Sequence, residues 1–197
     1  MHFKNVREQV SDRLREDVLL GKFKSGEVLR EAFLVDRFKV SRGPIREALL
    51  QLSLEGLLES VPNRGVRVGE VWTGELVPVM VGIRFDLECF AIDEVVRNTP
   101  EGFFDVIRRN LRLFRLACED NDMSEAIKLE LRFHRLIIRA SEQPGLEPVW
   151  LSLQGGMCLS YARPEILDEN YNEHSRIVDA LEKGDSNAAK AALKKIL

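Results

Sequence analysis

The sequence has 197 residues, 45% of them apolar and 31% charged, which is enough for two small domains or one larger domain with a real core. The formal net charge is −3, and no uninterrupted apolar run approaches the roughly 18 residues that a membrane-spanning helix needs. A membrane protein is therefore excluded, and we expect a globular cytoplasmic protein. Basic residues slightly outnumber acidic ones in residues 1–72 and acidic ones prevail in residues 73–197, so the first part suits contact with nucleic acid better.

The chain contains three cysteines, Cys89, Cys118 and Cys158, which are widely spaced and sit in apolar contexts. An odd number with this spacing is typical of reduced core thiols and argues against a disulfide framework or a cysteine-ligated zinc.

Two helices are expected near the N-terminus. Residues 5–20 carry apolar side chains at helical spacing, and Gly21 ends that stripe. Residues 31–38 are expected to form a short second helix. The next helix follows at once, so a tight turn must join the two, as in a helix-turn-helix.

Residues 39–57, KVSRGPIREALLQLSLEGL, predict a helix with two distinct faces. Ser41 is a favourable N-cap, and Pro44 falls in the first turn, where a missing N–H costs little. One face is apolar, while Arg42 and Arg46 lie on the other. A positive helix N-terminus with two guanidinium groups can reach guanine edges and phosphates in a major groove. The alternative is an ordinary amphipathic helix with a solvated charged face.

After Gly56 the pattern changes to alternation with a period of two. Residues 57–61 and 66–68 are expected to form two short strands around Pro62-Asn63-Arg64-Gly65. Helices followed by a hairpin with a basic tip predict a winged helix-turn-helix, in which Arg64 lies along the DNA backbone or the minor groove.

The run LREAFLVDRFKVSRGPIREALLQLSLEGLLESVPNRGVRV resembles the winged helix domain of the GntR family of bacterial transcription regulators. The resemblance extends from Val6 to Val71. It departs from the family at Lys39, where Gly is usual. Lys39 can stand there if it adopts a left-handed conformation at modest cost, or if the turn differs slightly. The DNA-contacting positions that the resemblance implies are Arg30, Ser41, Arg42, Gly43, Arg46, Arg64 and Gly65.

From residue 74 onward the periodicity predicts six helices and no strand, and therefore an antiparallel helical bundle. The expected helices span residues 75–97, 102–117, 123–140, 146–161 with an interruption at Gly155-Gly156, 165–181, and 187 to the end. The fold class is accordingly mostly α, with a winged helix-turn-helix domain in residues 1–72 and an all-helical domain in residues 73–197.

Three side chains of the bundle suggest a metal site. Glu130 and His134 lie four residues apart on the apolar side of one helix, and His174 lies on the apolar side of another. Buried acids and imidazoles are costly unless they are paired or bound to metal, and such a set can hold a divalent cation. The alternative is a buried hydrogen bond between Glu and His without a metal.

This half also resembles the FCD-type effector domain of the FadR subfamily. Glu130-Leu-Arg-Phe-His134 matches the family's acid-x-x-x-His pair, and the stretch from Glu173 to Asp185 matches its second histidine motif. The resemblance implies a metal such as zinc, nickel or manganese held by Glu130, His134 and His174. Ile196 stands where the family has a fourth ligand, so the protein ligand set is incomplete. Arg84 matches an arginine near the family's effector pocket, so the resemblance implies that it binds the effector. The alternative role for Arg84 is a surface or inter-helix salt bridge.

Together these features predict a homodimeric DNA-binding transcriptional regulator, most simply a repressor. The expected partners are a palindromic duplex operator and a small organic acid effector, with no membrane. One alternative is a hydrolytic enzyme that uses Glu130, His134 and His174 as a metal centre, but no accompanying acid, base or nucleophile motif supports it. Another is a metal or fatty-acyl binding module with degenerate DNA contacts, against which Arg42 and Arg46 argue.

Overall fold

The computed structural model describes residues 5–19, 21–62, 65–70, 73–161 and 167–197; for residues 124, 154–161 and 167–170 it describes only the backbone. The chain divides into two compact units, residues 1–74 with 151–162, and residues 75–150 with 163–197. Along the chain, the first boundary between the two units follows Gly74, close to the domain boundary expected after residue 72.

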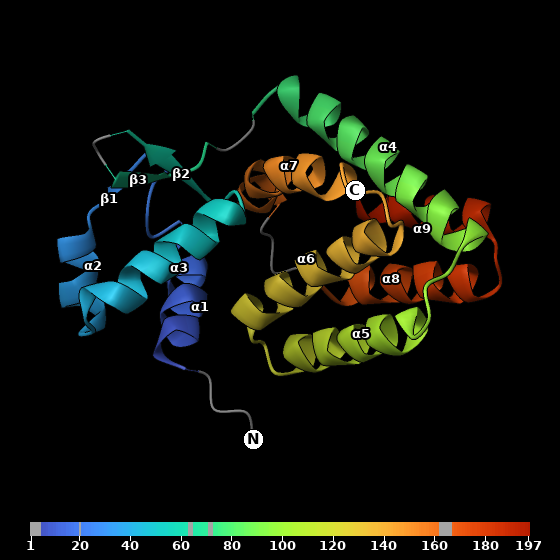
Figure 1. The fold of residues 1–197 in the computed structure, drawn as a ribbon, viewed down its shortest axis with the longest axis horizontal. Coiled ribbons are helices and arrows are strands. Elements are labelled where there is room, and N and C mark those ends of the chain that lie inside the picture. Colours follow the sequence, from blue (N-terminus) through green and yellow to red (C-terminus); the bar gives the residue numbers. More distant parts are fainter. Residues whose placement is uncertain (1–4, 20, 63–64, 71–72, 162–166) are drawn as a thin grey trace. The chain divides into compact units, whose positions relative to one another are not determined.

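Residues 5–70 of the first unit, where the structure describes them, contain the helices α1, α2 and α3 and a three-stranded antiparallel sheet in the order β1-β3-β2 (Figure 1). Its elements are α1 (Val6–Leu19), β1 (Val28–Leu29), α2 (Glu31–Phe38), α3 (Arg42–Leu54), β2 (Leu58–Val61) and β3 (Gly65–Val68). The two expected helices, the two-faced helix and the hairpin are therefore confirmed. The strand β1 was not expected, because two residues are too short to show an alternating pattern.

Helix α1 packs against α3 around a buried apolar core. Arg15 of α1 is 1% exposed, and its guanidinium donates to both carboxylate oxygens of Glu55 at the end of α3, at 2.9 and 3.0 Å. Such a forked pair fixes direction as well as distance, so it sets how α1 lies on α3. The apolar core side chains are Val10, Leu14, Val18, Phe23, Leu29, Leu34, Ile45, Ala48, Leu49, Leu52, Leu57, Leu58 and Val68.

The described part of the chain from residue 75 onward is helical and contains no strand (Figure 1). The helices are α4 (Leu76–Arg97), α5 (Phe103–Glu119), α6 (Met123–Ala140), α7 (Leu146–Tyr161), α8 (Leu167–Glu182) and α9 (Ser186–Ile196). Residues 75–150 and 167–197 form a helical bundle, while the second part of α7, from residue 151, belongs to the first unit. The expected interruption at Gly155-Gly156 was wrong, because α7 is continuous there. Glycine weakens a helix by only about 1 kcal/mol, which a helix of this length can absorb.

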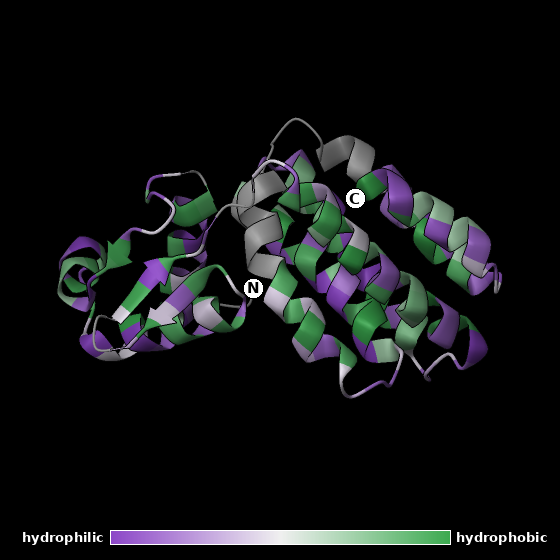
Figure 2. Ribbon diagram, turned by 90° about the horizontal axis from the view of Figure 1, so that it is seen from above, coloured by the Kyte–Doolittle hydropathy of each residue, from purple (hydrophilic) through white to green (hydrophobic). Residues whose placement is uncertain are grey.

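The bundle core lies between α4, α5, α6, α8 and α9, and α5 and α6 are strongly amphipathic. Figure 2 shows hydrophobic and hydrophilic residues alternating along the helices of the bundle, as is typical of helices that share a core. Asp122 and Asp185 begin α6 and α9 by accepting hydrogen bonds from the backbone N–H groups of Glu125 and Ala188. The buried aromatic and branched side chains include Ile92, Val95, Ile107, Leu111, Phe114, Ile127, Phe133, Ile137, Trp150, Ile177, Val178 and Leu193.

None of the described helices is long and apolar enough to cross a membrane.

Candidate DNA-binding surface and candidate metal site

The turn between α2 and α3 depends on one residue in an unusual conformation. Lys39 follows α2 with φ 55° and ψ 40°, which is the left-handed region where glycine is favoured. Of the two alternatives for Lys39, a left-handed residue or an altered turn, the structure has the left-handed residue. The turn brings α3 directly after α2, as a helix-turn-helix requires.

The N-terminal end of α3 is exposed to solvent. Ser41 occupies the N-cap position in an extended conformation, but its hydroxyl makes no capping hydrogen bond. Ser41, Arg42, Gly43 and Arg46 are all exposed, while Ile45 between them is fully buried. The predicted division of this helix into a core face and a basic face is therefore confirmed. Backbone N–H groups and arginines at an exposed helix N-terminus are suited to binding phosphates.

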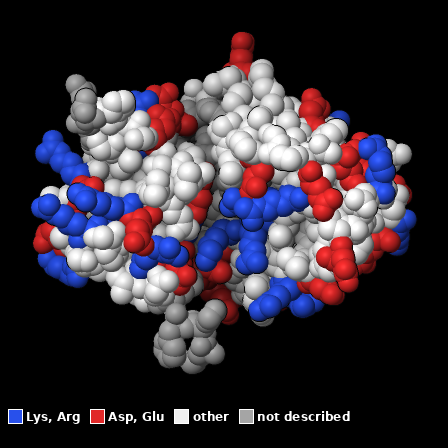
Figure 3. Space-filling view, viewed as in Figure 1, with Lys and Arg blue, Asp and Glu red and all other residues white. Residues whose placement is uncertain are grey.

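The start of α2, the middle of α3 and the wing border one shallow groove with a volume of about 500 Å³. Arg30, Arg46 and Gly65 are among its lining residues, so the structure brings together three of the sequence-predicted DNA contacts. Arg64 lies outside the described residues. On the face seen in Figure 3, basic side chains gather over α2 and α3, with acidic side chains between them.

In the second unit the three predicted metal ligands come together. One ligand atom from each of Glu130, His134 and His174 lies within 4.8 Å of the other two. Both histidines are fully buried, and Glu130 is partly exposed. The ring of Phe133 lies against both imidazoles, with centroids 5.5 Å from His134 and 4.6 Å from His174. An aromatic ring thus shields one side of the two imidazoles from water.

The spacing of the histidines fits a tetrahedral cation. The Nε2 atoms of His134 and His174 are 3.3 Å apart. Two nitrogens that each lie about 2.0–2.1 Å from zinc at a tetrahedral angle are separated by roughly 3.3–3.4 Å. The donor set of two imidazoles and one carboxylate also suits zinc and related divalent ions, so the residues present fit such a metal.

A further acid, Glu88 of α4, lies beside this group and was not identified from the sequence. Glu88 is 2% exposed, and one carboxylate oxygen accepts from His134 Nδ1 at 2.7 Å. The other oxygen accepts from Arg84 Nε at 2.5 Å and from Trp150 Nε1 at 2.8 Å. Burial alone would raise the pKa of Glu88, but the charge of Arg84 and the hydrogen bonds from His134 and Trp150 hold it far below its ordinary value.

Arg84 is 7% exposed and forms an ion pair with Glu88, four residues along the same helix. The alternative of a surface salt bridge is therefore wrong, because both side chains of this pair are buried. The guanidinium carbon of Arg84 also lies 5.9 Å from the centre of the Trp150 ring. Arg84 is accordingly connected to His134 through Glu88.

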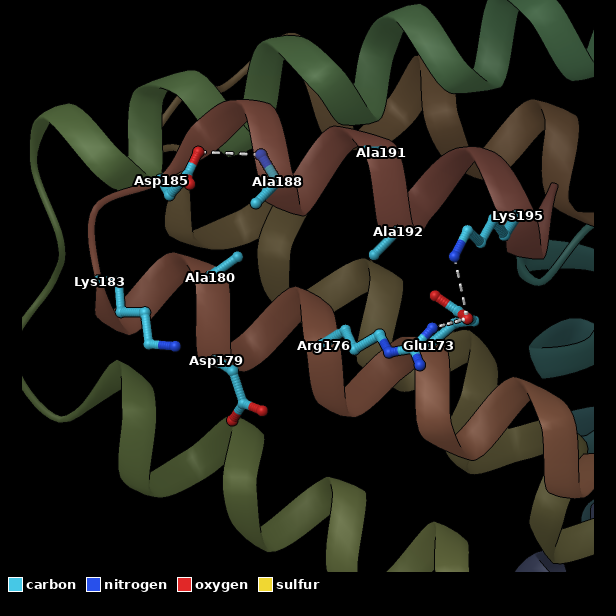
Figure 4. Close-up of a pocket in the computed structure, with 10 residues that line it drawn as sticks. All are labelled: Glu173, Arg176, Asp179, Ala180, Lys183, Asp185, Ala188, Ala191, Ala192 and Lys195. Carbon is cyan, nitrogen blue, oxygen red and sulfur yellow. Dashed lines mark hydrogen bonds and ion pairs between the residues drawn. The ribbon is translucent and has the colours of Figure 1, made fainter.

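A separate groove of about 420 Å³ lies between α8 and α9. In Figure 4 its alanines, among them Ala188 and Ala192, line the space between the two helices, and Glu173 pairs with Arg176 and Lys195. Neither His174 nor the other two predicted ligands line this groove. Acids and bases alternate along it, so it has no excess of charge that would select a small anion or cation.

Comparison with known proteins identifies the family. Residues 6–68 match the model of the bacterial regulatory proteins of the gntR family, and residues 80–197 match the FCD domain. The chain belongs to the GntR family of regulators with an FCD domain. It is 31% identical over 191 residues to a probable D-xylose utilization operon transcriptional repressor of Paenarthrobacter nicotinovorans, covering 95% of this chain and 84% of that protein.

Other GntR-type relatives agree with this assignment. The transcriptional repressor RspR of Escherichia coli is 27% identical, with 95% of this chain and 84% of that protein covered. Among solved structures, Escherichia coli McbR/YncC has a TM-score of 0.67 at 25% identity, covering 98% of this chain and 94% of that chain. A putative GntR regulator from Rhodococcus sp. RHA1 has a TM-score of 0.68 at 22% identity over 96% of this chain and 92% of that chain, and so shares the fold.

The predicted class of protein, a transcriptional regulator and not an enzyme, is confirmed by the family and by the named relatives. The hydrolytic alternative for Glu130, His134 and His174 is thereby removed.

Proposed function

We propose that this GntR-family protein is a dimeric transcriptional repressor of the FadR subfamily, controlled by a small organic acid that binds beside a divalent metal in the FCD domain. The observation that carries the metal part is the convergence of Glu130, His134 and His174 with 3.3 Å between the two imidazole Nε2 atoms. Repression is supported by relatives named as repressors, including the gluconate operon repressor of Bacillus subtilis at 27% identity.

The DNA contacts would come from the start of α2, the N-terminal half of α3 and the wing. Support comes from the exposure of the basic face of α3. The opposite face is buried in the core, which fixes the orientation of the helix. Arg46 and Arg42 are the candidates for reading guanine edges, because a guanidinium can donate two parallel hydrogen bonds to one guanine. The proposed contact residues are Arg30, Ser41, Arg42, Gly43, Arg46, Arg64 and Gly65.

A homodimer is supported by an apolar stripe that α4 exposes. Leu76, Val79, Ile83 and Phe90 recur at near-heptad spacing and are 42–56% exposed. Their spacing places them on one side of the helix, where burial against a second copy would remove them from water. Two recognition helices related by a two-fold axis would read a palindromic operator.

Three protein ligands leave open positions on a tetrahedral or larger coordination sphere. Ile196, the last residue of α9, supplies no donor where the family has its fourth ligand. When bound, the metal supplies a positive centre that attracts a carboxylate. Arg84 adds a further cation to this region. An organic acid that bound to its guanidinium would compete with Glu88 for that group. An organic acid effector is therefore preferred over a neutral sugar.

The proposal is tested by metal analysis and calorimetry on the purified full chain. We expect zinc to bind at one equivalent per chain in the wild type and much more weakly in His174→Ala. A simple dicarboxylate should bind more tightly to the zinc-loaded protein than to the metal-free protein. By linkage, an effector that changes operator affinity must itself bind differently when operator DNA is present. Equal uptake of zinc by both proteins would overturn the assignment of the three ligands.

A further inference from the structure

Glu88 joins three helices through a single buried carboxylate. It lies on α4, His134 lies on α6 and Trp150 lies on α7. The carboxylate receives hydrogen bonds from both of them and from Arg84. Arginine and tryptophan can only donate, so the oxygen that faces them must accept. With a cation at 2.5 Å, the group is the ionised carboxylate and has no proton to give to His134.

This arrangement decides where the proton of the His134 ring lies. A carboxylate can only accept, so Nδ1 of His134 must carry the hydrogen that Glu88 receives at 2.7 Å. In the neutral ring Nε2 then has a lone pair that can bind a metal. That atom is the one that faces His174 Nε2 at 3.3 Å, where a metal would bind. A carboxylate that accepts from the distal nitrogen of a metal-binding histidine fixes the ring and raises its basicity.

We propose that Glu88 is the positioning residue of the metal site: it fixes the Nδ1–H form of His134 and links the orientation of that ring to Arg84. The inference rests on the metal role proposed above and adds a residue to it. A ligand that draws Arg84 away from Glu88 changes the partners of the same carboxylate that holds His134. Effector binding and metal affinity are thereby coupled through two adjacent hydrogen bonds.

The decisive variant is Glu88→Gln, which keeps the size of the side chain. Arg84 and Trp150 are both donors, so the amide must turn its oxygen toward them and its NH₂ group toward His134. Nδ1 of His134 then has to accept, and its proton moves to Nε2, which faces the metal position. A side chain that served only to fill space would not move this proton.

The measurement is nitrogen NMR of the histidine rings in metal-free full-length protein, together with zinc titration. We expect the Nδ1–H form of His134 in the wild type and the Nε2–H form in Glu88→Gln, with zinc affinity lowered by about 10- to 100-fold. Trp150→Phe is the matched control, because it removes one donor from the other carboxylate oxygen and leaves the bond to His134. It should keep the wild-type tautomer and change zinc affinity by less than about threefold.

Two results would overturn the role of Glu88. One is an Nε2–H form of His134 in the wild type, which can be observed even if Glu88→Gln does not fold. The other is an unchanged tautomer and zinc affinity in a folded Glu88→Gln. A wild type that binds no zinc leads to a different conclusion, because it removes the metal role itself and with it any part that Glu88 plays in metal binding.

Discussion

Nε of Arg46 on α3 donates to both carboxylate oxygens of Glu31 on α2, at 3.0 and 2.9 Å. The side chains are 64% and 38% exposed, so the pair contributes little to stability, on the order of 0–1 kcal/mol. Its main effect is orientation, because it holds a proposed DNA-reading arginine in one direction before DNA arrives. Nε is one of five donors of the guanidinium, so the two terminal NH₂ groups are still suited to a bidentate contact.

Replacing Arg46 with alanine should weaken binding to a selected operator by about 1–3 kcal/mol. The loss at random duplex DNA should be smaller, because only the operator offers the matching base. Fluorescence anisotropy at fixed salt measures both affinities. Arg13→Ala on α1, which removes another exposed arginine, is the control and should leave operator discrimination unchanged. Equal operator affinity of the wild type and the Arg42→Ala, Arg46→Ala double variant would contradict the proposed recognition surface.

Replacing Glu31 with glutamine should have a different effect on the same surface. Removing a negative charge near the DNA strengthens non-specific binding, because phosphates are no longer repelled. At the same time Arg46 loses the partner that orients it, so the ratio of operator affinity to random-sequence affinity should fall several-fold. Titrations of both duplexes over a range of salt concentrations check this. A rise in operator affinity that preserves the ratio would show that Glu31 does not orient Arg46.

Replacing Lys39 with glycine should stabilise the first unit. A non-glycine residue at φ 55° carries a left-handed penalty of roughly 1–2 kcal/mol, part of which is offset because glycine is more flexible in the unfolded chain. The net gain should be about 1 kcal/mol, measured by urea unfolding. Lys39→Ala is the matched control: it also removes the exposed ion pair with Asp36 but keeps a Cβ atom, so it should give no gain.

Asp17 should make the first unit dependent on pH. It is 1% exposed and accepts from Lys22 Nζ at 2.7 Å and Arg37 Nη2 at 2.8 Å. Burial by itself would raise the pKa of Asp17, but the hydrogen bonds and charges of Lys22 and Arg37 prevail and lower it. Because the folded pKa lies below the unfolded pKa of about 3.9, the stabilisation is complete above that pH and is lost as the pH falls through the folded pKa.

Asp17→Asn should therefore cost on the order of 1–3 kcal/mol in the free energy of unfolding at pH 7, and this difference should shrink below about pH 4. Urea unfolding at several pH values provides the measurement. Asp36→Asn serves as the control, because Asp36 is 83% exposed in its pair with Lys39. A cost of Asp17→Asn that stays constant down to acid pH would rule out the ion pairs as its cause.

Zinc should raise the melting temperature of the wild type and leave that of His174→Ala nearly unchanged. At a free concentration of 100 times the dissociation constant, a ligand of the folded state stabilises it by about 2.7 kcal/mol. Melting with added zinc and with a chelator measures the effect. Asp105→Ala removes an exposed acid at the start of α5 and should respond to zinc as the wild type does. If neither zinc nor the chelator changes the melting temperature of the wild type, Glu130, His134 and His174 form only a polar cluster.

Local patterns were enough to predict the elements that carry the proposed DNA contacts. The two faces of α3 follow from helical periodicity, and the proximity of Glu130 to His134 follows from their spacing on one helix. The pairing with His174 was inferred from its place on an apolar face together with the family resemblance. For α3, α6 and α8 alike, the apolar face of the helix predicts which side chains point into the core.

Glu88 was not predictable in the same way. Its spacing from Arg84 suggests an ion pair within one helix, but His134 is 46 residues away in the chain and reaches it only through the packing of α4 against α6. The strand β1 was missed because its two residues pair with Arg67 and Val66 of β3 far along the sequence. Long-range hydrogen bonds of this kind leave no periodic trace in the chain.

The indole of Trp150 is 1% exposed, donates to Glu88 and lies beside the Arg84 guanidinium. The chain has only two tryptophans, Trp72 and Trp150, so Trp72→Phe would leave a single tryptophan, in contact with the carboxylate that also holds His134. Any ligand that moved the charged groups of Arg84 or Glu88 would alter the emission wavelength or the intensity of Trp150 fluorescence. The protein therefore carries its own optical reporter, with which candidate acids and metals can be screened without a label and without knowledge of the operator.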